Sequence, residues 1–577
     1  MNDLLIQGGT LVDGTGASAR VASVAINKGL IVAVGDAAEV PARRVINARG
    51  LLVTPGFVDI HTHYDGQATW DPFLTPSTWH GVTTCVFGNC GVGFAPVRPD
   101  KTDFLINLME GVEDIPGAAL AEGIQWEWET FPQYLDAISR RHYALDIGTQ
   151  VPHGPLRAYV MGPRGTANEE ATPEDIRQMA QLTLEGLRAG ALGFSTSRVL
   201  IHKSKSGELV PGTFASRDEL FGIGHAIRGA GHGLFQMTSI HEQLASEYAW
   251  IEDLARETGC TVQFNLQQAD AAPGQWQEVL AMVEDAQVRG LHIYAGMAGR
   301  PAGMLYSWQS SLHPFYGYPS FDAIVKLPWA EKMRQLTAPG FRERLLGETP
   351  RDLGPMGNFV TRSWHKLFLL GDPPEYEPDP SHSVAAIAAR SGRPPAEVAF
   401  DLMMGPGAGG VAGTALLYFP IFNYANGQMD HLMRLMQSQA TVLSLGDGGA
   451  HCGFICDASL PTFMLTHWAR DRSRGARLPL EFIVRRQTRD TARLYGLQDR
   501  GVLAPGYKAD LNLIDFQGLR LEAPHFVNDL PAQGRRLVQA AHGYRATIVN
   551  GVPVMLDGQP TGDLPGGLIR GPQAAPV

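Results

Sequence analysis

Cysteine is scarce in this chain, with five residues in 577. So few cysteines do not make a disulfide framework of the kind that holds small secreted proteins together. Cys85 and Cys90 are close in sequence, as are Cys452 and Cys456, while Cys260 stands alone. The ordinary interpretation of each is a small buried apolar residue, although the motif around Cys90 favours another role.

Positive charge and long apolar runs are also in short supply. The chain carries 47 basic and 58 acidic residues, a net charge of −11, which argues against nucleic acid or an anionic membrane as partner. No apolar stretch approaches the roughly 20 residues that span a bilayer. The start, MNDLLIQGGTLVDG, lacks a cationic segment followed by an apolar one. We therefore expect a cytoplasmic protein with a small-molecule substrate, and a homo-oligomer stays open.

Glycine, in contrast, is abundant. The 66 glycines and the hydrophobic fraction of 44% are typical of an α/β enzyme with many strand-to-helix turns. Between residues 56 and 497, helical patterns such as PEDIRQMAQLTLEGLRAGA alternate with strand-like runs such as FVDIHTH, VTTCVFGNC, ALGFSTSR and TVLSLGDGGAH. Eight such runs predict a (β/α)8 TIM-like barrel.

Three segments depart from this alternation. Residues 1–55 and 498–577 consist of short strand-like runs, with a strong hairpin turn at Asn550-Gly551. We expect these two ends to pair into one small β-sandwich beside the barrel. Residues 303–380, rich in aromatic residues and proline (GMLYSWQSSLHPFYGYPSF), predict an insertion. It is either a lid or pocket wall over the mouth of the barrel, or a surface for packing or oligomer contact.

The strongest chemical signal is His61-Thr62-His63, at the end of the apolar run FVDI. Side chains two positions apart on a strand point to the same face. Two imidazoles on one face can bind one divalent transition metal. The alternative is a chance pair of unrelated polar residues, but the apolar strand and the preceding Pro-Gly favour a metal site.

A second strand-like run, TVLSLGDGGAH, ends at Asp447. A carboxylate at the end of a late strand can complete a metal site and move protons during catalysis. An aspartate followed by two glycines is also typical of a simple turn. Together with His61 and His63, Asp447 is more readily interpreted as a functional residue.

These motifs resemble the amidohydrolase superfamily. GVTTCVFGNCGVGFAPV, VPHGPLRAYVMG, GALGFSTSR and GDGGAHCGFICDASLPT resemble, more closely, the longer members of the D-aminoacylase (N-acyl-D-amino-acid deacylase) family. The resemblance covers nearly the whole chain. It implies that His61, His63 and Cys90 are metal ligands and that Asp447 is a ligand and the catalytic acid and base. The cofactor it implies is a divalent metal, with Zn²⁺ expected; a thiolate is a good zinc ligand.

The chain departs from this family at two positions. D-aminoacylases carry two further metal histidines at the ends of later strands. Here those strands carry Met237-Thr238-Ser239 and Asn265-Leu266-Gln267 instead. Thr238, Ser239, Asn265 and Gln267 are poor zinc ligands. The sequence therefore leaves open whether the site holds one ion or two, and how.

Three histidines are candidate replacements in an additional part of the site. His202 follows a strand-like run directly, His451 lies four residues after Asp447, and His241 lies just beyond the degraded motif. His451 is equally a candidate proton shuttle, because its ordinary pKa lies near neutral pH. His241 is more simply an exposed residue at a helix start. Lys203 and Lys205 could carry a carbamate, but each is more simply a solvated loop lysine.

Substrate recognition is predicted to involve Arg198, Arg300 and His153. Arginine binds a carboxylate through two parallel hydrogen bonds, and both arginines end strand-like runs. A salt bridge at the barrel rim is an equal alternative for each of them. His153, in VPHGPLR, resembles a family position near the pocket, and a hydrogen-bonded core histidine is the alternative.

The sequence thus predicts a metal-dependent hydrolase that cleaves a C–N amide bond, with an N-acyl-D-amino acid or a related small amide as substrate. The substrate rests on the resemblance alone, since a fold does not define a reaction. Cyclic amides, peptide-like conjugates, esters or a lyase reaction in the same site remain alternatives. So does a catalytically silent relative that serves as a scaffold, although the retention of the four site residues argues against it.

Overall fold

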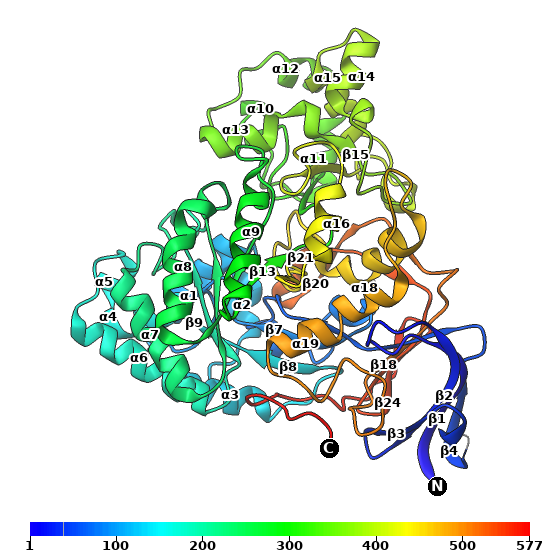
Figure 1. Cartoon of the computed structure of the whole chain (residues 1–577). Helices are drawn as coiled ribbons and strands as arrows, with labels where there is room; N and C mark the ends of the chain where they lie inside the picture. The colour runs from blue at the N-terminus through cyan, green and yellow to red at the C-terminus, as the bar shows by residue number, and fades with distance from the viewer. Residues whose placement is uncertain (39) are drawn as a thin grey trace.

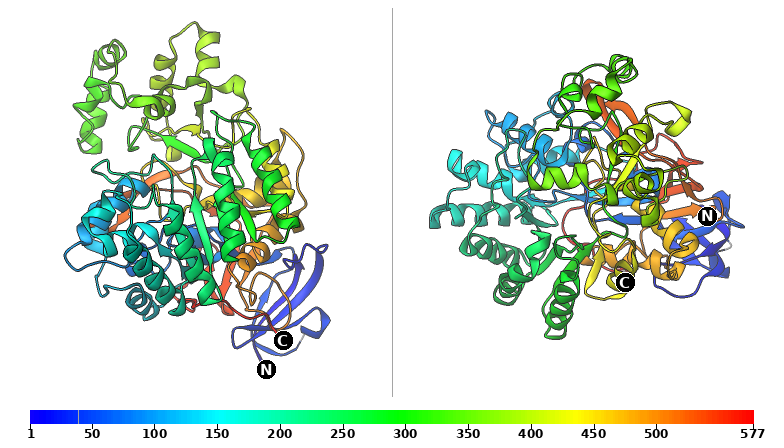
Figure 2. Two further views of the ribbon diagram at one scale, coloured as in Figure 1. Left: turned by 60° about the vertical axis from the view of Figure 1, so that its left-hand side comes forward. Right: turned by 90° about the horizontal axis from the view of Figure 1, so that it is seen from above.

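The computed structural model describes residues 1–38 and 40–577. Parallel strands surrounded by helices form the body of the molecule (Figure 1). A sheet that includes the N-terminal strands lies beside this body, and a helical unit from the middle of the chain stands out from its opposite end (Figures 1 and 2).

The parallel strands of the body form two sheets. Strands β6, β7 and β8 pair in that order, and strands β9, β10, β11, β12, β13 and β17 pair in that order. Gln150 alone separates β8 from β9, so the chain passes directly from one sheet into the other. The bounds of these strands are β6 (Phe57–Asp59), β7 (Val82–Phe87), β8 (Asp146–Thr149), β9 (Val151–Pro152), β10 (Gly193–Ser197), β11 (Leu234–Thr238), β12 (Thr261–Asn265), β13 (Ile293–Met297) and β17 (Thr441–Leu443).

The two sheets also meet at their other edges. A parallel bridge joins Thr62, after β6, to Gly448, after β17. The His63 N–H donates to the Gly448 carbonyl at 2.7 Å, and the Asp447 N–H donates to the His61 carbonyl at 2.9 Å. Residues from the first and the last of these strands are therefore held side by side by backbone hydrogen bonds.

Helices alternate with the parallel strands, as the sequence predicts. In the helix before β10, Thr172 and Asp175 form a capping box and proline occupies the first turn, while Met179 and Leu187 are buried on one face. The helices of the body are α1 (Thr102–Glu113), α2 (Gly117–Gly123), α3 (Phe131–Ser139), α4 (His153–Met161), α5 (Pro163–Thr166), α6 (Pro173–Arg188), α7 (Arg217–Ala230), α8 (Leu244–Thr258), α9 (Gln275–Val288), α16 (Asp430–Gln437), α17 (Leu460–Phe463), α18 (Leu480–Arg486) and α19 (Arg489–Leu494).

The two ends of the chain pair in one mixed sheet, in the order β25-β24-β23-β18-β5-β1-β2-β3, with β4 on β1. The predicted hairpin at Asn550-Gly551 is confirmed: Val549 pairs with Val552, and both turn residues have positive φ. The strands are β1 (Asn2–Leu11), β2 (Arg20–Asn27), β3 (Leu30–Val34), β4 (Ala42–Asn47), β5 (Leu52–Pro55), β18 (Leu511–Ile514), β23 (Tyr544–Val549), β24 (Val552–Leu556) and β25 (Gln559–Pro560).

The predicted insertion has its own hydrophobic core. Trp308 lies in this core with its ring stacked on Phe315 and edge-on to Phe400. The buried cluster runs past the predicted end at residue 380 and reaches Phe419. Its elements are β14 (Gly303–Tyr306), α10 (Pro319–Asp322), α11 (Trp329–Leu336), α12 (Phe341–Leu346), α13 (Gly354–Arg362), β15 (Phe368–Leu369), α14 (Val384–Ser391), α15 (Pro395–Met403) and β16 (Leu417–Pro420).

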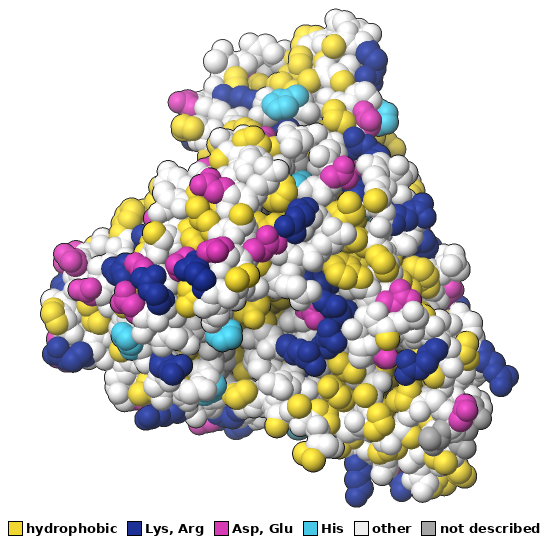
Figure 3. All heavy atoms as spheres, viewed as in Figure 1, with side chains coloured by type: hydrophobic (Ala, Val, Ile, Leu, Met, Phe, Trp, Pro, Cys, Tyr) yellow, Lys and Arg dark blue, Asp and Glu magenta, His cyan; other side chains and the backbone are white. Residues whose placement is uncertain are grey.

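The surface agrees with the modest net charge. Acidic and basic side chains are interspersed on the face shown in Figure 3. Within the described residues, no helix is both long enough and apolar enough to cross a bilayer.

Candidate metal centre

The metal centre predicted around His61 and His63 lies at the junction of the two parallel sheets. Both side chains are 1% exposed. They follow β6 in a segment that the Thr62–Gly448 bridge fixes against the end of β17. The Thr62 N–H also donates to the carbonyl of Val86 at the end of β7. Three strands thus fix the backbone that carries the two imidazoles.

Cys90 reaches the same point from the turn after β7. Its backbone is left-handed, with φ of 56°, and Gly88 and Gly91 on either side also have positive φ. A side chain at Gly91 would come within 3.0 Å of the Thr196 backbone. The turn therefore packs tightly against β10 and directs the thiol inward. The Cys90 Sγ lies 3.4 Å from the His61 Nε2.

Asp447 completes the group from the end of β17. Its Oδ1 lies 3.4 Å from the His61 Nε2 and 3.8 Å from the His63 Nε2. Its side chain is 16% exposed, while both histidines are enclosed. Asp447 is therefore the more exposed member of the group.

These donors suit a divalent transition metal. One ligand atom from each of His61, His63 and Cys90 can be chosen so that all lie within 4.8 Å of one another. Two imidazoles, a thiolate and a carboxylate are the donors that zinc prefers. The Nε2 atoms of His61 and His63 both face the Asp447 Oδ1, and the His61 Nε2 also faces the Cys90 Sγ, so the donor atoms face one another.

Electrostatics favour the same conclusion. Burial lowers the pKa of His61 to about 3, and repulsion from His451 and His202 adds to this effect. Burial also holds the pKa of His63 well below its usual value, and raises the pKa values of Cys90 and Asp447. Neutral imidazoles are ready to bind a cation, and a nearby divalent ion would favour the ionised thiol and carboxyl.

The positions of the two missing family histidines are filled by neutral polar side chains. The Asn265 Nδ2 donates to the Thr238 Oγ1 at 3.0 Å, and the Gln263 Nε2 donates to the Asn265 Oδ1 at 3.2 Å. Because Thr238 accepts from Asn265, its own hydroxyl hydrogen can be donated to the Cys90 Sγ, 3.3 Å away. Ser239 is buried, and Gln267 accepts a hydrogen bond from Asn423.

Two of the candidate additional histidines border this group. His451 is 20% exposed, and its Nε2 lies 3.6 Å from the Glu113 Oε2. The His202 Nδ1 is hydrogen-bonded to Ser197 at 2.9 Å, and burial lowers its pKa to about 3 with help from His451 and His241. These mutual effects mean that the three histidines are near one another.

The remaining candidates have other surroundings. His241 is buried with its ring edge-on to Phe422, so it is not exposed at a helix start. Lys203 and Lys205 are exposed, and Lys205 pairs with Glu110. The ordinary interpretation of both lysines, as solvated loop residues, agrees with these positions.

The three residues predicted to bind substrate have protein partners. Arg300 is 1% exposed and donates to Asp457 at 2.7 Å. Arg198 donates to Glu247 at 2.8 Å. His153 is bonded on one side to Thr196 and on the other to Glu219, both at 2.8 Å. Their roles toward substrate stay predictions, and these contacts favour the structural alternatives.

Sequence reasoning missed Glu113, the last residue of α1. Its side chain is 2% exposed, and its Oε1 lies 3.4 Å from the His63 Nδ1. Burial, with repulsion from Asp447 and Asp65, raises its pKa well above the usual value. The sequence offered one indication. A carboxylate at the C-terminal end of a helix interacts unfavourably with the helix dipole, so a glutamate there suggests a role other than helix stability.

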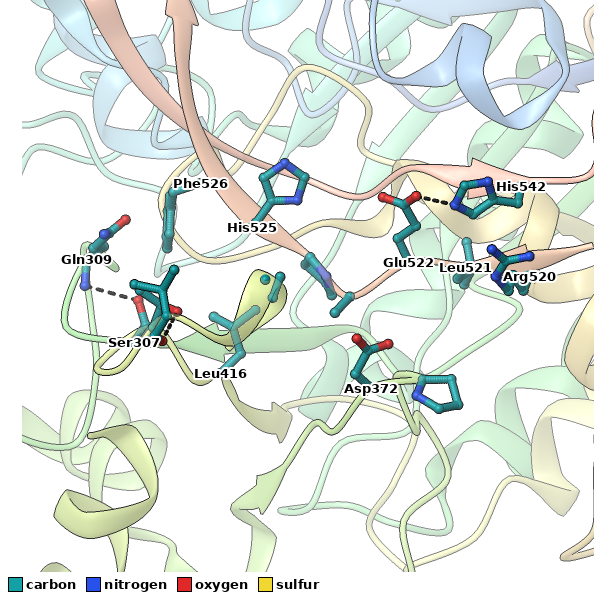
Figure 4. A pocket seen from close by; sticks show the side chains of 17 residues that line it. Ser307, Gln309, Asp372, Leu416, Arg520, Leu521, Glu522, His525, Phe526 and His542 are labelled. Atoms are coloured by element: carbon teal, nitrogen blue, oxygen red, sulfur yellow. Dashed lines mark hydrogen bonds and ion pairs between the residues drawn. The ribbon is translucent and has the colours of Figure 1, made fainter. Parts of the chain in front are cut away.

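A large cavity lies elsewhere, between the insertion and the C-terminal strands (Figure 4). It has a volume of about 790 Å³ and is lined by Asp372, Arg520 and His525, among others, with Glu522 and His542 paired at one side. None of the four metal-centre residues lines it. This cavity and the candidate metal centre are therefore separate places in the molecule.

Comparison with known families identifies the family of the chain. The model of the amidohydrolase family matches residues 44–555. The chain belongs to the amidohydrolase family. It is accordingly a hydrolase that acts on C–N bonds.

Individual relatives of this amidohydrolase narrow the comparison. D-aminoacylase of Alcaligenes xylosoxydans xylosoxydans is 28% identical over 561 residues, covering 96% of this chain and 94% of that protein. N-acyl-D-aspartate deacylase of the same organism is 32% identical, over 49% of this chain and 53% of that protein.

Solved structures share the α/β fold. A D-aminoacylase structure described as having a binuclear metal centre aligns with a TM-score of 0.66 at 23% identity, over 99% of this chain and 100% of that one. N-acyl-D-glutamate deacylase from Bordetella bronchiseptica, solved with zinc and a phosphonate inhibitor, aligns with a TM-score of 0.64 at 23% identity, over 99% of each chain.

Proposed function

We propose that this amidohydrolase hydrolyses an N-acyl-D-amino acid or a related small amide, at a centre that holds one divalent ion. The observation that carries the proposal is the convergence of His61, His63, Cys90 and Asp447 from three strand ends on one enclosed point. The substrate class is supported by the relatives that act on N-acyl-D-amino acids.

The proposed ligands are His61 Nε2, His63 Nε2, the Cys90 thiolate and Asp447, with Zn²⁺ as the ion that suits these donors best. When bound, such an ion supplies Lewis acidity that polarises an amide carbonyl and activates water. His61 and His63 bind as neutral rings, in agreement with the lowered pKa values that their burial causes.

Asp447 is the proposed proton carrier. As the more exposed member of the group, its carboxylate can accept a proton from the attacking water and return it to the leaving amine. A bound divalent ion would keep this carboxylate ionised, so that it can accept the proton.

A row of hydrogen bonds that joins Gln263, Asn265, Thr238 and Cys90 favours a single ion. In a site for two ions, donors from β11 and β12 would face the second ion. Here the polar side chains of β11 and β12 hydrogen-bond to one another and to the Cys90 sulfur. Hydroxyl and amide groups are also poor zinc donors beside a thiolate.

The fold proposed for this chemistry is a closed (β/α)8 barrel over residues 56–497, with 1–55 and 498–577 forming the accompanying β domain. Support comes from the pairing of β6 to β8 and β9 to β17, and from the Thr62–Gly448 bridge between their outer edges. With β8 and β9 taken as one strand, the pairing includes the strands that such a barrel needs. Catalytic groups at the carboxyl ends of these strands are the usual arrangement.

Two measurements test the proposal. Elemental analysis of purified protein is expected to find close to one Zn²⁺ per chain after equilibration with the metal. A panel of N-acyl-D- and N-acyl-L-amino acids, cyclic amides and esters is then expected to show turnover of the D series. Turnover of another class of compound alone would refute the proposed substrate class. Failure to bind any transition metal would refute the proposal that the protein is a metal-dependent hydrolase.

The variant Asp447→Asn separates the proton carrier from the fold. We expect it to keep the fold and a bound ion and to lose roughly 10²- to 10⁴-fold in kcat, the usual contribution of a general acid and base. Asp285→Asn is a matched control, because the exposed Asp285 side chain pairs with Arg289 on the surface, at the end of α9. Full activity in Asp447→Asn would remove Asp447 from this role.

A further inference from the structure

Glu113 is a buried carboxylate whose surroundings ask for an explanation. It ends α1, where the helix dipole disfavours negative charge, and its side chain is 2% exposed. Across residues 1–38 and 40–577, no lysine or arginine pairs with it. Its Oε1 has no hydrogen-bond partner in the described chain. Enclosing a carboxylate in this way is costly unless a cationic centre or hydrogen-bond donors offset it.

The two oxygens of Glu113 face two imidazoles. Its Oε1 lies 3.4 Å from the His63 Nδ1, and its Oε2 lies 3.6 Å from the His451 Nε2. Both separations are slightly longer than good hydrogen bonds, and a small adjustment would bring them into that range. His63 thus has a carboxylate on each side: Glu113 at Nδ1 and Asp447, 3.8 Å away, at Nε2.

The end of α1 is held firmly enough to position this side chain. The carbonyl of Glu113 accepts the N–H of His451. The next residue, Asp114, adopts the left-handed conformation, and its carboxylate accepts from the Gly453 N–H at 2.9 Å and from the Ser311 hydroxyl at 2.6 Å. The helix end is therefore tied to the loop after β17 and to the insertion.

We propose that Glu113 is a positioning residue of the metal centre: it accepts the Nδ1–H of His63 through one oxygen and engages His451 through the other. A histidine that binds an ion through Nε2 carries its proton on Nδ1, and a carboxylate acceptor there fixes the tautomer and the ring orientation. Glu113 thereby holds the His63 Nε2 toward the ion and connects an enclosed ligand with a histidine that reaches solvent. The inference rests on the proposed metal function.

The decisive experiment compares Zn²⁺ affinity in the full-length wild type, Glu113→Gln and Glu113→Ala, by competition with a chelator. Loss of such a carboxylate lowers metal affinity by about 10- to 100-fold in comparable sites. We expect this loss in Glu113→Ala and a smaller one in Glu113→Gln, whose amide oxygen can still accept from Nδ1–H. Glu110→Gln, one turn earlier on α1 and paired with Lys205 at the surface, is the matched control and should bind as the wild type does.

Co²⁺ absorption distinguishes positioning from direct ligation. The spectrum of the Co²⁺-loaded Glu113→Gln variant should keep the thiolate charge-transfer band and the band positions of the wild type, because the same atoms bind the ion. A spectrum of altered coordination would make Glu113 a ligand and overturn the proposal. Unchanged Zn²⁺ affinity in both variants would also overturn it while the metal function stands. A wild type that binds no ion would refute the metal function itself.

Discussion

The contact between Glu377 and Arg472 leads to a quantitative prediction about stability and pH. Glu377 lies in the insertion, between β15 and α14, and Arg472 lies in the body, between α17 and α18. The Arg472 guanidinium donates to both carboxylate oxygens, at 2.9 and 3.0 Å, and His467 lies 3.0 Å from the same carboxylate. Both charged side chains are at most 1% exposed. The pair joins the insertion to the body without access to water.

The magnitude follows from the pKa of Glu377. Burial alone would raise it, but the hydrogen bonds from His467 and Arg472 outweigh burial and lower the pKa from 4.5 to about 2. A group with a depressed folded-state pKa stabilises the protein above its unfolded-state pKa, and this contribution is lost as pH falls through the folded value. The contribution is about 3 kcal/mol above pH 5 and disappears between about pH 4.5 and pH 2.

The variant Glu377→Gln removes this charge and leaves Arg472 buried beside Asp430. We expect it to lower the free energy of unfolding by about 3 to 5 kcal/mol at pH 7, as measured by urea unfolding followed by tryptophan fluorescence. The difference from the wild type should shrink as pH falls from 4.5 toward 2. Glu174→Gln, which breaks an exposed pair with Arg177, should show no resolvable change. A difference that is small at pH 7, or constant with pH, would refute the reasoning.

Two further predictions concern the metal centre. The double variant Thr238→His, Asn265→His places imidazoles at the two positions where the chain departs from the family. Elemental analysis should then find more than one bound ion per chain, approaching two. A ratio that stays at one would show that these two positions do not determine the number of ions. Gly88→Ala should destabilise the protein by about 1–2 kcal/mol or more and weaken metal binding, because φ is +77° and the new Cβ would lie 2.5 Å from the Gln150 carbonyl. Gly229→Ala, in open space on a helix, should be neutral or stabilising in the same unfolding assay.

Much of the body could be predicted from local pattern. Apolar runs that end in polar residues identify β6 and β17 and their terminal His61, His63 and Asp447, since strand periodicity is a local property. The hairpin at Asn550-Gly551 follows from turn chemistry alone. The family resemblance, carried by the motif around Cys90, supplied the prediction that its thiol is a ligand, which spacing alone could not have made.

Long-range contacts account for what the sequence could not predict. Arg300 ends a strand in a way that suggests a substrate carboxylate, yet Asp457, far along the chain, occupies its guanidinium. Glu113 belongs to a helix with an ordinary amphipathic pattern, and the left-handed Asp114 and the loop after β17 bring its carboxylate beside His63. Such contacts depend on where distant loops meet, which periodicity does not encode.

Charge balance limits how tightly a second ion can bind, whichever neutral side chains occupy positions 238 and 265. The two positive charges of a bound divalent ion would be offset by the Cys90 thiolate and the Asp447 carboxylate. A second divalent ion would bring two more positive charges into an enclosed site, where unbalanced charge is costly. Thr238 and Asn265 contribute no negative charge, and neither would histidines in their place. In the double histidine variant, the second ion should therefore bind more weakly than the first, and titration with Zn²⁺ should resolve two steps.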